Sequence, residues 1–150
     1  MLFLNFVNSK LYKQENLKKT VNIRKRIVAI IIKNKKILLV KGKGYNELWT
    51  PGGKIEEGET QEETLKRELK EEINLEVLSM KFFKTYLNQS PYSKDWMTET
   101  KCFFATVNGT PKPQKEIEAI IWYGKDDGKN YPMIEENEKL IADLMKENLL

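Results

Sequence analysis

The chain contains no histidine among its 150 residues, and it has a single cysteine, Cys102. Without an imidazole, Ser-His and Cys-His catalysis are excluded, and so is a zinc site built from histidine and cysteine. One cysteine allows no intrachain disulfide, which favours a reducing, cytoplasmic setting. Any enzyme chemistry must therefore rely on carboxylates, lysines, tyrosines or a hard metal ion.

Targeting and polyanion-binding segments are also lacking. The apolar start, MLFLNFVNSK, has neither the leading positive region nor the cleavage site of a signal peptide, and no stretch has the length of a membrane span. The charge balance is mildly basic, with 26 Lys and Arg against 22 Asp and Glu, but no long basic run occurs. We expect one domain over residues 1–150, with 1–20 as a ragged or strand-forming extension. We expect no DNA-binding segment, no membrane contact, and a monomer or homodimer.

What is present is a series of apolar blocks that have the lengths of single elements. Apolar runs at 27–32 and 37–40 predict buried strands. Thr60 followed three residues later by Glu63 is a capping box, which predicts a helix over 61–73. Strands are expected at 23–32, 36–40, 48–50, 76–88, 96–107 and 117–123, and a last helix carries Ile134, Ile141, Leu144 and Met145 on one face. This order predicts an α/β domain with a mixed sheet.

Three carboxylates, Glu68, Glu71 and Glu72, lie within five residues of the predicted helix. They occupy one face about 100° wide, beside the apolar stripe. Like charges at these spacings destabilise a helix, and one cation, Arg67 pairing with Glu63 or Glu71, does not neutralise them. A bound Mg²⁺, Mn²⁺ or Ca²⁺ would neutralise the three carboxylates. The alternative is an ordinary surface helix of a charged protein.

The spacing of fixed residues from Gly53 to Leu75 resembles the 23-residue Nudix box. The matching positions are Gly53, Glu59, Arg67, Glu68, Glu71 and Glu72, with apolar Leu69 and Leu75. Asn74 stands where the family usually has glycine, but asparagine is the next-best residue for a left-handed helix end. The resemblance implies a Nudix-type α/β/α sandwich with a central mixed β-sheet. It also implies an enzyme that hydrolyses a nucleoside diphosphate linked to another group.

The same resemblance implies roles for the box residues. The three carboxylates of the acidic face would hold Mg²⁺ or Mn²⁺ with the carbonyl of Gly52, and the metal would activate a water. Glu59 and Arg67, together with Gly53, would orient the loop and the helix. The general base would be Glu68 or Glu71, or a glutamate of a later loop, as in MutT-like members. Glu116 is the candidate in that loop, with Glu118 and Glu99 as alternatives.

Substrate-binding residues lie outside the box. Asn137 resembles an asparagine that contacts the base in members acting on oxidised guanine nucleotides. Tyr45, Tyr92 and Trp96 could stack on a base, and Lys54, Lys41 and Lys43 could meet phosphates or simply be solvated. Five aromatic residues are expected in the core instead: Phe82, Phe83, Phe103, Phe104 and Trp122.

The leading expectation is a MutT-like enzyme that cleaves a nucleoside triphosphate to the monophosphate and pyrophosphate. Hydrolysis of ADP-ribose, dinucleoside polyphosphates or RNA 5′ ends is a second expectation. A non-catalytic nucleotide sensor is the third, although sensors tend to lose box glutamates and this chain keeps them.

Overall fold

The computed structural model describes residues 21–90, 93–128 and 130–150. The predictions for residues 1–20 and for Tyr92 lie outside this range. The strands are β1 (Asn22–Ile30), β2 (Ile32–Lys33), β3 (Lys36–Gly42), β4 (Leu48–Trp49), β5 (Gly52–Lys54), β6 (Glu76–Gln89), β7 (Trp96–Asn108) and β8 (Ile117–Gly124). The helices are α2 (Gln61–Ile73), the short 3₁₀ helix η1 (Lys125–Asp127) and α3 (Glu135–Lys146). No helix of the described part is long and apolar enough to cross a membrane.

The strands form two four-stranded sheets. One has the order β5-β1-β7-β6, in which β1 and β7 run parallel while the other neighbours are antiparallel. In the other, β3 pairs with β2, β4 and β8, all antiparallel. The first of these sheets, β5-β1-β7-β6, is therefore mixed, as the sequence predicted. The parallel neighbours β1 and β7 are joined by a long connection that contains α2, as parallel pairing requires.

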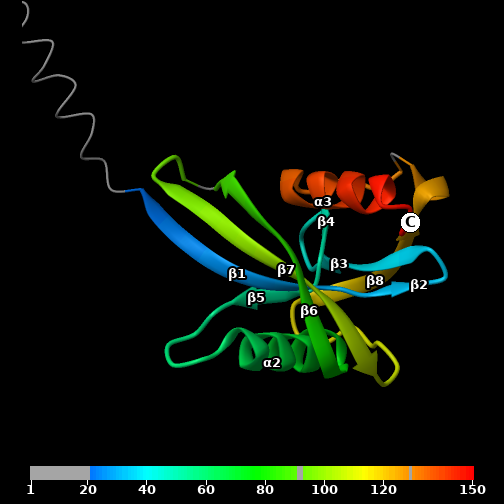
Figure 1. The fold of residues 1–150 in the computed structure, drawn as a ribbon, viewed down its shortest axis with the longest axis horizontal. Coiled ribbons are helices and arrows are strands. Elements are labelled where there is room, and N and C mark those ends of the chain that lie inside the picture. Colours follow the sequence, from blue (N-terminus) through cyan, green and yellow to red (C-terminus); the bar gives the residue numbers. More distant parts are fainter. Residues whose placement is uncertain (1–20, 91–92, 129) are drawn as a thin grey trace, which may run out of the picture.

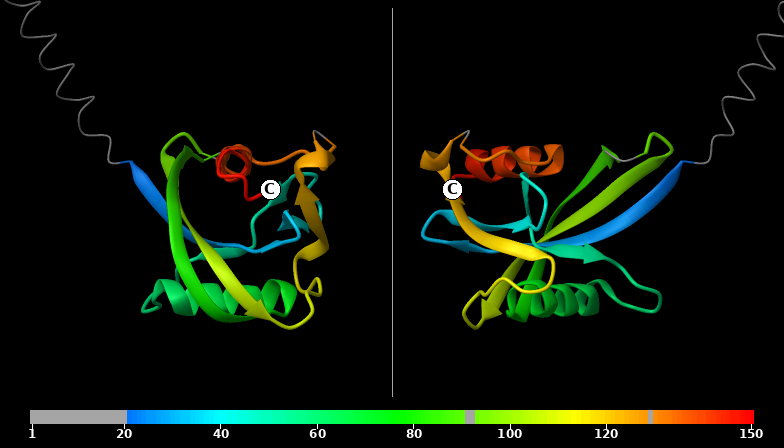
Figure 2. Two further views of the ribbon diagram at one scale, coloured as in Figure 1. Left: turned by 45° about the vertical axis from the view of Figure 1, so that its right-hand side comes forward. Right: turned by 180° about the vertical axis from the view of Figure 1, so that it is seen from behind.

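Helices α2 and α3 lie on opposite sides of the strands (Figure 1; Figure 2). Consecutive residues of β1 point alternately to the two sides: Ala29 joins the cluster under α2, and Val28 and Ile30 join the cluster under α3. Strands buried on both faces need unbroken apolar runs, which explains the runs at 27–32 and 37–40. The expected α/β/α sandwich is confirmed.

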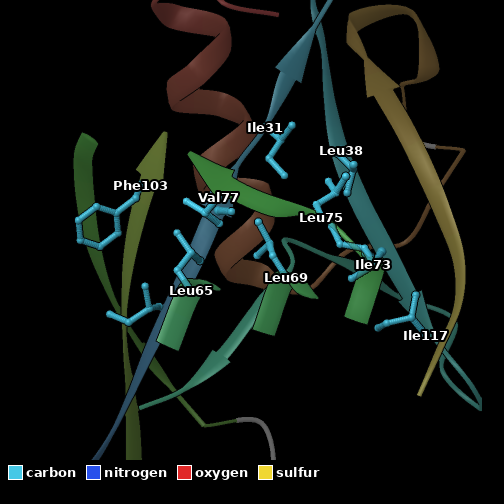
Figure 3. Packing of buried hydrophobic residues seen from close by; sticks show 12 residues of the cluster. Ile31, Leu38, Leu65, Leu69, Ile73, Leu75, Val77, Phe103 and Ile117 are labelled. Carbon is cyan, nitrogen blue, oxygen red and sulfur yellow. The ribbon is translucent and has the colours of Figure 1, made fainter. Parts of the chain in front are cut away.

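The cluster under α2 fixes the helix that carries the acidic face. Leu65, Leu69 and Ile73 point from α2 toward the strands and meet Val77 and Phe103 there (Figure 3). All three α2 residues have no measurable exposure. Burying such a side chain contributes about 1.5–3 kcal/mol, so the rotation of the helix about its axis is well determined.

Two expectations about individual segments are wrong. No strand is expected at 52–54, because Gly52 and Gly53 favour a break in regular structure, yet these residues form β5 against β1. Phe82, expected in the core, is 52% exposed, because it lies on the edge strand β6 and only packs edge-to-face on Phe103.

Candidate active site

The capping box holds the start of helix α2. The hydroxyl of Thr60 accepts a hydrogen bond from the N–H of Glu63 (3.2 Å), and the Glu63 carboxylate accepts one from the N–H of Thr60 (2.8 Å). Glu63 and Glu71 are the two expected partners of Arg67. Because Glu63 is engaged in the cap, its expected pairing with Arg67 is wrong. The other, Glu71, lies 3.8 Å from Nη1 of Arg67.

Arg67 connects the preceding loop to the acidic face. Its Nε and Nη2 donate to the two carboxylate oxygens of Glu59 at 2.6 and 2.9 Å, and Nη1 donates to Glu68 at 2.7 Å. Nη2 also donates to the carbonyl of Lys54. The hydrogen bond from Arg67 lowers the pKa of Glu59 to about 2. This bidentate pair fixes the loop relative to the helix.

The acidic face borders the buried side of α2, as its helical spacing predicted. Glu72 is only 5% exposed, whereas the Glu68 and Glu71 side chains are 14% and 39% exposed. The three carboxylates thus run from the interior to the surface along one side of the helix.

Two glycines let the neighbouring strand approach this face closely. Gly52 has φ of +139°, and a Cβ there would collide with the carbonyl oxygen of Ile27 on β1. At Gly53 a Cβ would collide with the Glu68 carboxylate. The N–H of Gly52 donates to Glu72 at 3.1 Å. Gly53 is therefore required by contact with the acidic face, and Gly52 by its close approach to β1 and its positive φ.

Burial, together with the charges of Glu68 and Glu116, raises the pKa of Glu72 to about 8. The hydrogen bond from Gly52 and the charge of Arg26 act in the opposite direction but do not offset the burial. A negative charge at Glu72 is therefore costly unless a cation lies beside it.

The loop before β8 brings Glu116 toward this cluster. The N–H of Gln114 donates to the carbonyl of Glu72 (2.9 Å), and the carbonyl of Glu116 accepts from the N–H of Lys43 (2.8 Å). These bonds tie the loop to the end of α2 and to β3. The negative charge of Glu116 contributes to the raised pKa of Glu72.

The two alternatives to Glu116 lie elsewhere. Glu118 forms an ion pair with Lys41 at 3.5 Å. Glu99 lines a small cavity with Lys25 and Gln61, beside the start of α2. Of the three candidates, Glu116 is the one whose charge acts on the acidic face.

The acidic face has the donor set of a hard divalent cation, since carboxylate oxygens suit Mg²⁺ and Mn²⁺. The buried Glu72 also needs the positive charge that such an ion supplies. Within the described ranges, however, no group of three acidic or cysteine side chains is arranged to hold a metal ion as it stands. Glu68 is engaged by Arg67, and Glu71 by Lys115 at 3.0 Å. The residues present fit the ion, but these carboxylates must first leave their cationic partners.

Asn137 lies at the start of α3 with 1% exposure. Its Oδ1 accepts hydrogen bonds from the N–H and the hydroxyl of Thr50 at 3.2 and 2.8 Å, and its Nδ2 donates to the carbonyl of Leu48. These bonds tie the turn before β5 to α3. The base contact of Asn137 stays a prediction, and in this structure its oxygen is engaged by Thr50.

The other predicted substrate contacts are at the surface. Tyr45 is 50% exposed and packs edge-to-face on Trp49, and Lys54 is exposed at the end of β5. Trp96 is 40% exposed, with Arg24 over its ring. None of these contacts is tested by the structure.

Sequence reasoning missed Lys115 and Arg26. Both act on the acidic face from distant parts of the chain, Lys115 by an ion pair and Arg26 by its charge. No spacing rule reveals such a pair, since it depends on how the loop before β8 returns to the end of α2. The one available signal was the position of Lys115 next to Glu116.

The fold and the acidic helix define the class, a MutT-like α/β/α sandwich. A MutT Nudix hydrolase from Burkholderia pseudomallei superposes with a TM-score of 0.69 at 21% identity, covering 81% of this chain and 97% of the other. A Nudix hydrolase from Nitrosomonas europaea gives a TM-score of 0.71 at 20% identity, with 84% and 90% covered.

The sequence itself identifies the family. The model of the Nudix domain matches residues 23–144. An 8-oxo-dGTP diphosphatase from Buchnera aphidicola (subspecies Schizaphis graminum) is 32% identical over 126 residues, covering 80% of this chain and 92% of the relative. The chain belongs to the Nudix family, and it is an enzyme, a pyrophosphohydrolase.

Proposed function

We propose that this enzyme depends on Mg²⁺ or Mn²⁺ and cleaves a nucleoside triphosphate, oxidised purine nucleotides included, to the monophosphate and pyrophosphate. The observation that carries the proposal is the buried Glu72, which accepts a hydrogen bond from the N–H of Gly52 and whose pKa is raised by burial and by the charges of Glu68 and Glu116. The similarity to an 8-oxo-dGTP diphosphatase supports the substrate. The match over residues 23–144 supports one catalytic domain.

In this proposal Glu68, Glu71 and Glu72 hold the cation together with the carbonyl of Gly52. When bound, the cation neutralises phosphate charge and makes water a stronger acid. Glu59 and Arg67 touch no substrate, and they hold β5 and the loop after it against the helix so that the carboxylates stay on one side. The rigid contact between Gly53 and Glu68 serves the same purpose.

The proton of the attacking water goes to a carboxylate. We assign this role to Glu116, because its loop is tied to α2 and its charge acts on Glu72. Glu68 and Glu71 are the alternatives within the box. A general base contributes about 10²–10⁴-fold in rate, so Glu116→Gln should cost that much if the assignment is right.

Substrate contacts beyond the phosphates are assigned to Lys54 and Tyr45. Lys54 is exposed at the end of β5, the strand that carries Gly52, which suits a phosphate contact. The exposed ring of Tyr45 suits stacking on a base. Contact of Asn137 with the base would require its oxygen to leave Thr50.

The test is a panel of nucleotides assayed with Mg²⁺, with products resolved by mass. We expect monophosphate and pyrophosphate from oxidised and ordinary purine triphosphates. We also expect Glu72→Gln to lose activity by at least the roughly 10- to 100-fold that loss of a supporting group at a metal site costs. Glu62→Gln is the matched control, since Glu62 is on the same helix but pairs with Lys66 at the surface. Turnover confined to ADP-ribose or dinucleoside polyphosphates, or an active Glu72→Gln enzyme, would contradict the proposal.

A further inference from the structure

The ammonium group of Lys115 forms an ion pair with the carboxylate of Glu71. Its Nζ lies 3.0 Å from Oε2 of Glu71, and Nη1 of Arg67 is the more distant cation at 3.8 Å from the same oxygen. Glu68 and Glu72 have other partners, Arg67 and the N–H of Gly52. Each carboxylate of the acidic face therefore has its own donor, and the one at Glu71 comes from a distant loop.

The backbone determines the position of Lys115. The residue has φ of +50°, an uncommon conformation for a residue other than glycine. A turn closes around it, in which the N–H of Ile117 donates to the carbonyl of Gln114 at 3.0 Å. The N–H of Gln114 is bonded to α2 in turn, as described above. Helix α2 therefore holds, through its own carbonyls, the loop that delivers Lys115 to Glu71.

A divalent cation bound through Oε2 of Glu71 and the ammonium of Lys115 repel each other and compete for the lone pairs of that oxygen, so each weakens the binding of the other. We propose that Lys115 is a positioning residue that serves as the resident counter-ion of Glu71 and is exchanged for the divalent cation when the metal binds. This inference rests on the proposed metal-binding role of Glu71. In the metal-free protein Lys115 neutralises the charge of Glu71. Because it competes with the metal ion, it also lowers the affinity of the site for that ion.

The experiment measures binding of Mn²⁺ to the metal-free full-length protein without nucleotide, from the electron paramagnetic resonance signal of free Mn²⁺. Lys115→Met should bind Mn²⁺ about two- to fivefold more tightly than the original chain, the range that a partly exposed ion pair supports. Lys115→Arg, which keeps the charge, should restore the original affinity. Lys112→Met, which removes a charge from the same loop at another exposed position, should leave it unchanged.

Glu71→Gln separates failure of the exchange from failure of the metal assignment. If Glu71→Gln weakens Mn²⁺ binding but Lys115→Met does not tighten it, the exchange is wrong and the metal role of Glu71 stands. If Glu71→Gln binds Mn²⁺ as the original chain does, both are wrong. Equal tightening in Lys112→Met and Lys115→Met would also overturn the exchange, since net charge alone would then account for it. Thermal unfolding of each variant confirms that the compared proteins are folded.

Discussion

At the scale of single residues, Glu72 shows how the fold prepares a carboxylate for a cation. Burial and two neighbouring carboxylates raise its pKa to about 8, against an ordinary value of 4.5. The folded protein therefore holds a proton at Glu72 more tightly than the unfolded chain does. The stabilisation that results is fully present below about pH 4.5 and is lost as the pH rises through about 8.

This shift predicts a pH-dependent difference between the original chain and Glu72→Gln. In metal-free buffer the variant should gain stability relative to the original as the pH rises from 5 to 9, by up to about 4 kcal/mol, since each pKa unit is worth about 1.4 kcal/mol. Urea unfolding at several pH values measures the difference. A difference that stays constant across this range would show that Glu72 is not perturbed, and Mg²⁺ should reduce it where it exists.

Asn137 was predicted to contact a base, yet in the structure it accepts two hydrogen bonds from buried Thr50. Asn137→Ala should lower the free energy of unfolding by about 1–3 kcal/mol, because the donors of Thr50 then lose their partner. Thr50→Val is the comparison, since it removes the hydroxyl but keeps the N–H, and it should cost less. If Asn137→Ala is as stable as the original chain but no longer discriminates between bases, the contact with Thr50 is incidental.

At the scale of elements, helix α2 begins and ends where its sequence signals stand. The capping box at Thr60 and the left-handed Asn74, with φ of +57°, bound the helix at Gln61 and Ile73 as predicted. Both signals are local, since they depend on a few consecutive residues and the geometry of one helix end. This is why the boundaries of this helix could be predicted from sequence alone.

The left-handed helix end gives a prediction for Asn74. Asn74→Gly should be neutral or slightly stabilising, because glycine adopts positive φ without strain. Asn74→Ala should lose about 1 kcal/mol, since alanine has a side chain and no group that compensates for the conformation. Thermal unfolding of the two variants tests this. Equal stability of the glycine and alanine variants would show that the conformation at residue 74 does not limit the helix.

The short strand β5 shows where local signals fail. Its two glycines indicate a turn, and one of them has the positive φ that a turn would use. Yet Gly52 and Gly53 pair with Val28 and Ile27 of β1. Gly53 is required because the Glu68 carboxylate approaches this strand, and Gly52 is required because β1 does. Both approaches are properties of the tertiary structure, which no local pattern contains.

At the scale of the whole molecule, the apolar runs and the capping box were sufficient to predict the layered mixed-sheet fold. The box glutamates could be found from spacing, because one helix presents all three on one side. Their partners could not, since Lys115 and Arg26 approach through chain segments far away in sequence. Exposure at the sheet edge, as for Phe82, was missed for the same reason: composition does not say which strand lies at the edge.

The central claim is that the acidic face of α2 holds divalent cations beside a polyphosphate. Anomalous scattering from a crystal grown with Mn²⁺ and a non-hydrolysable nucleoside triphosphate tests it most directly. We predict a manganese peak in contact with Glu72 and at least one of Glu68 and Glu71, with the phosphates against it and Lys115 released from Glu71. Bound nucleotide with no manganese at this face, and with Lys115 still paired to Glu71, would contradict the account.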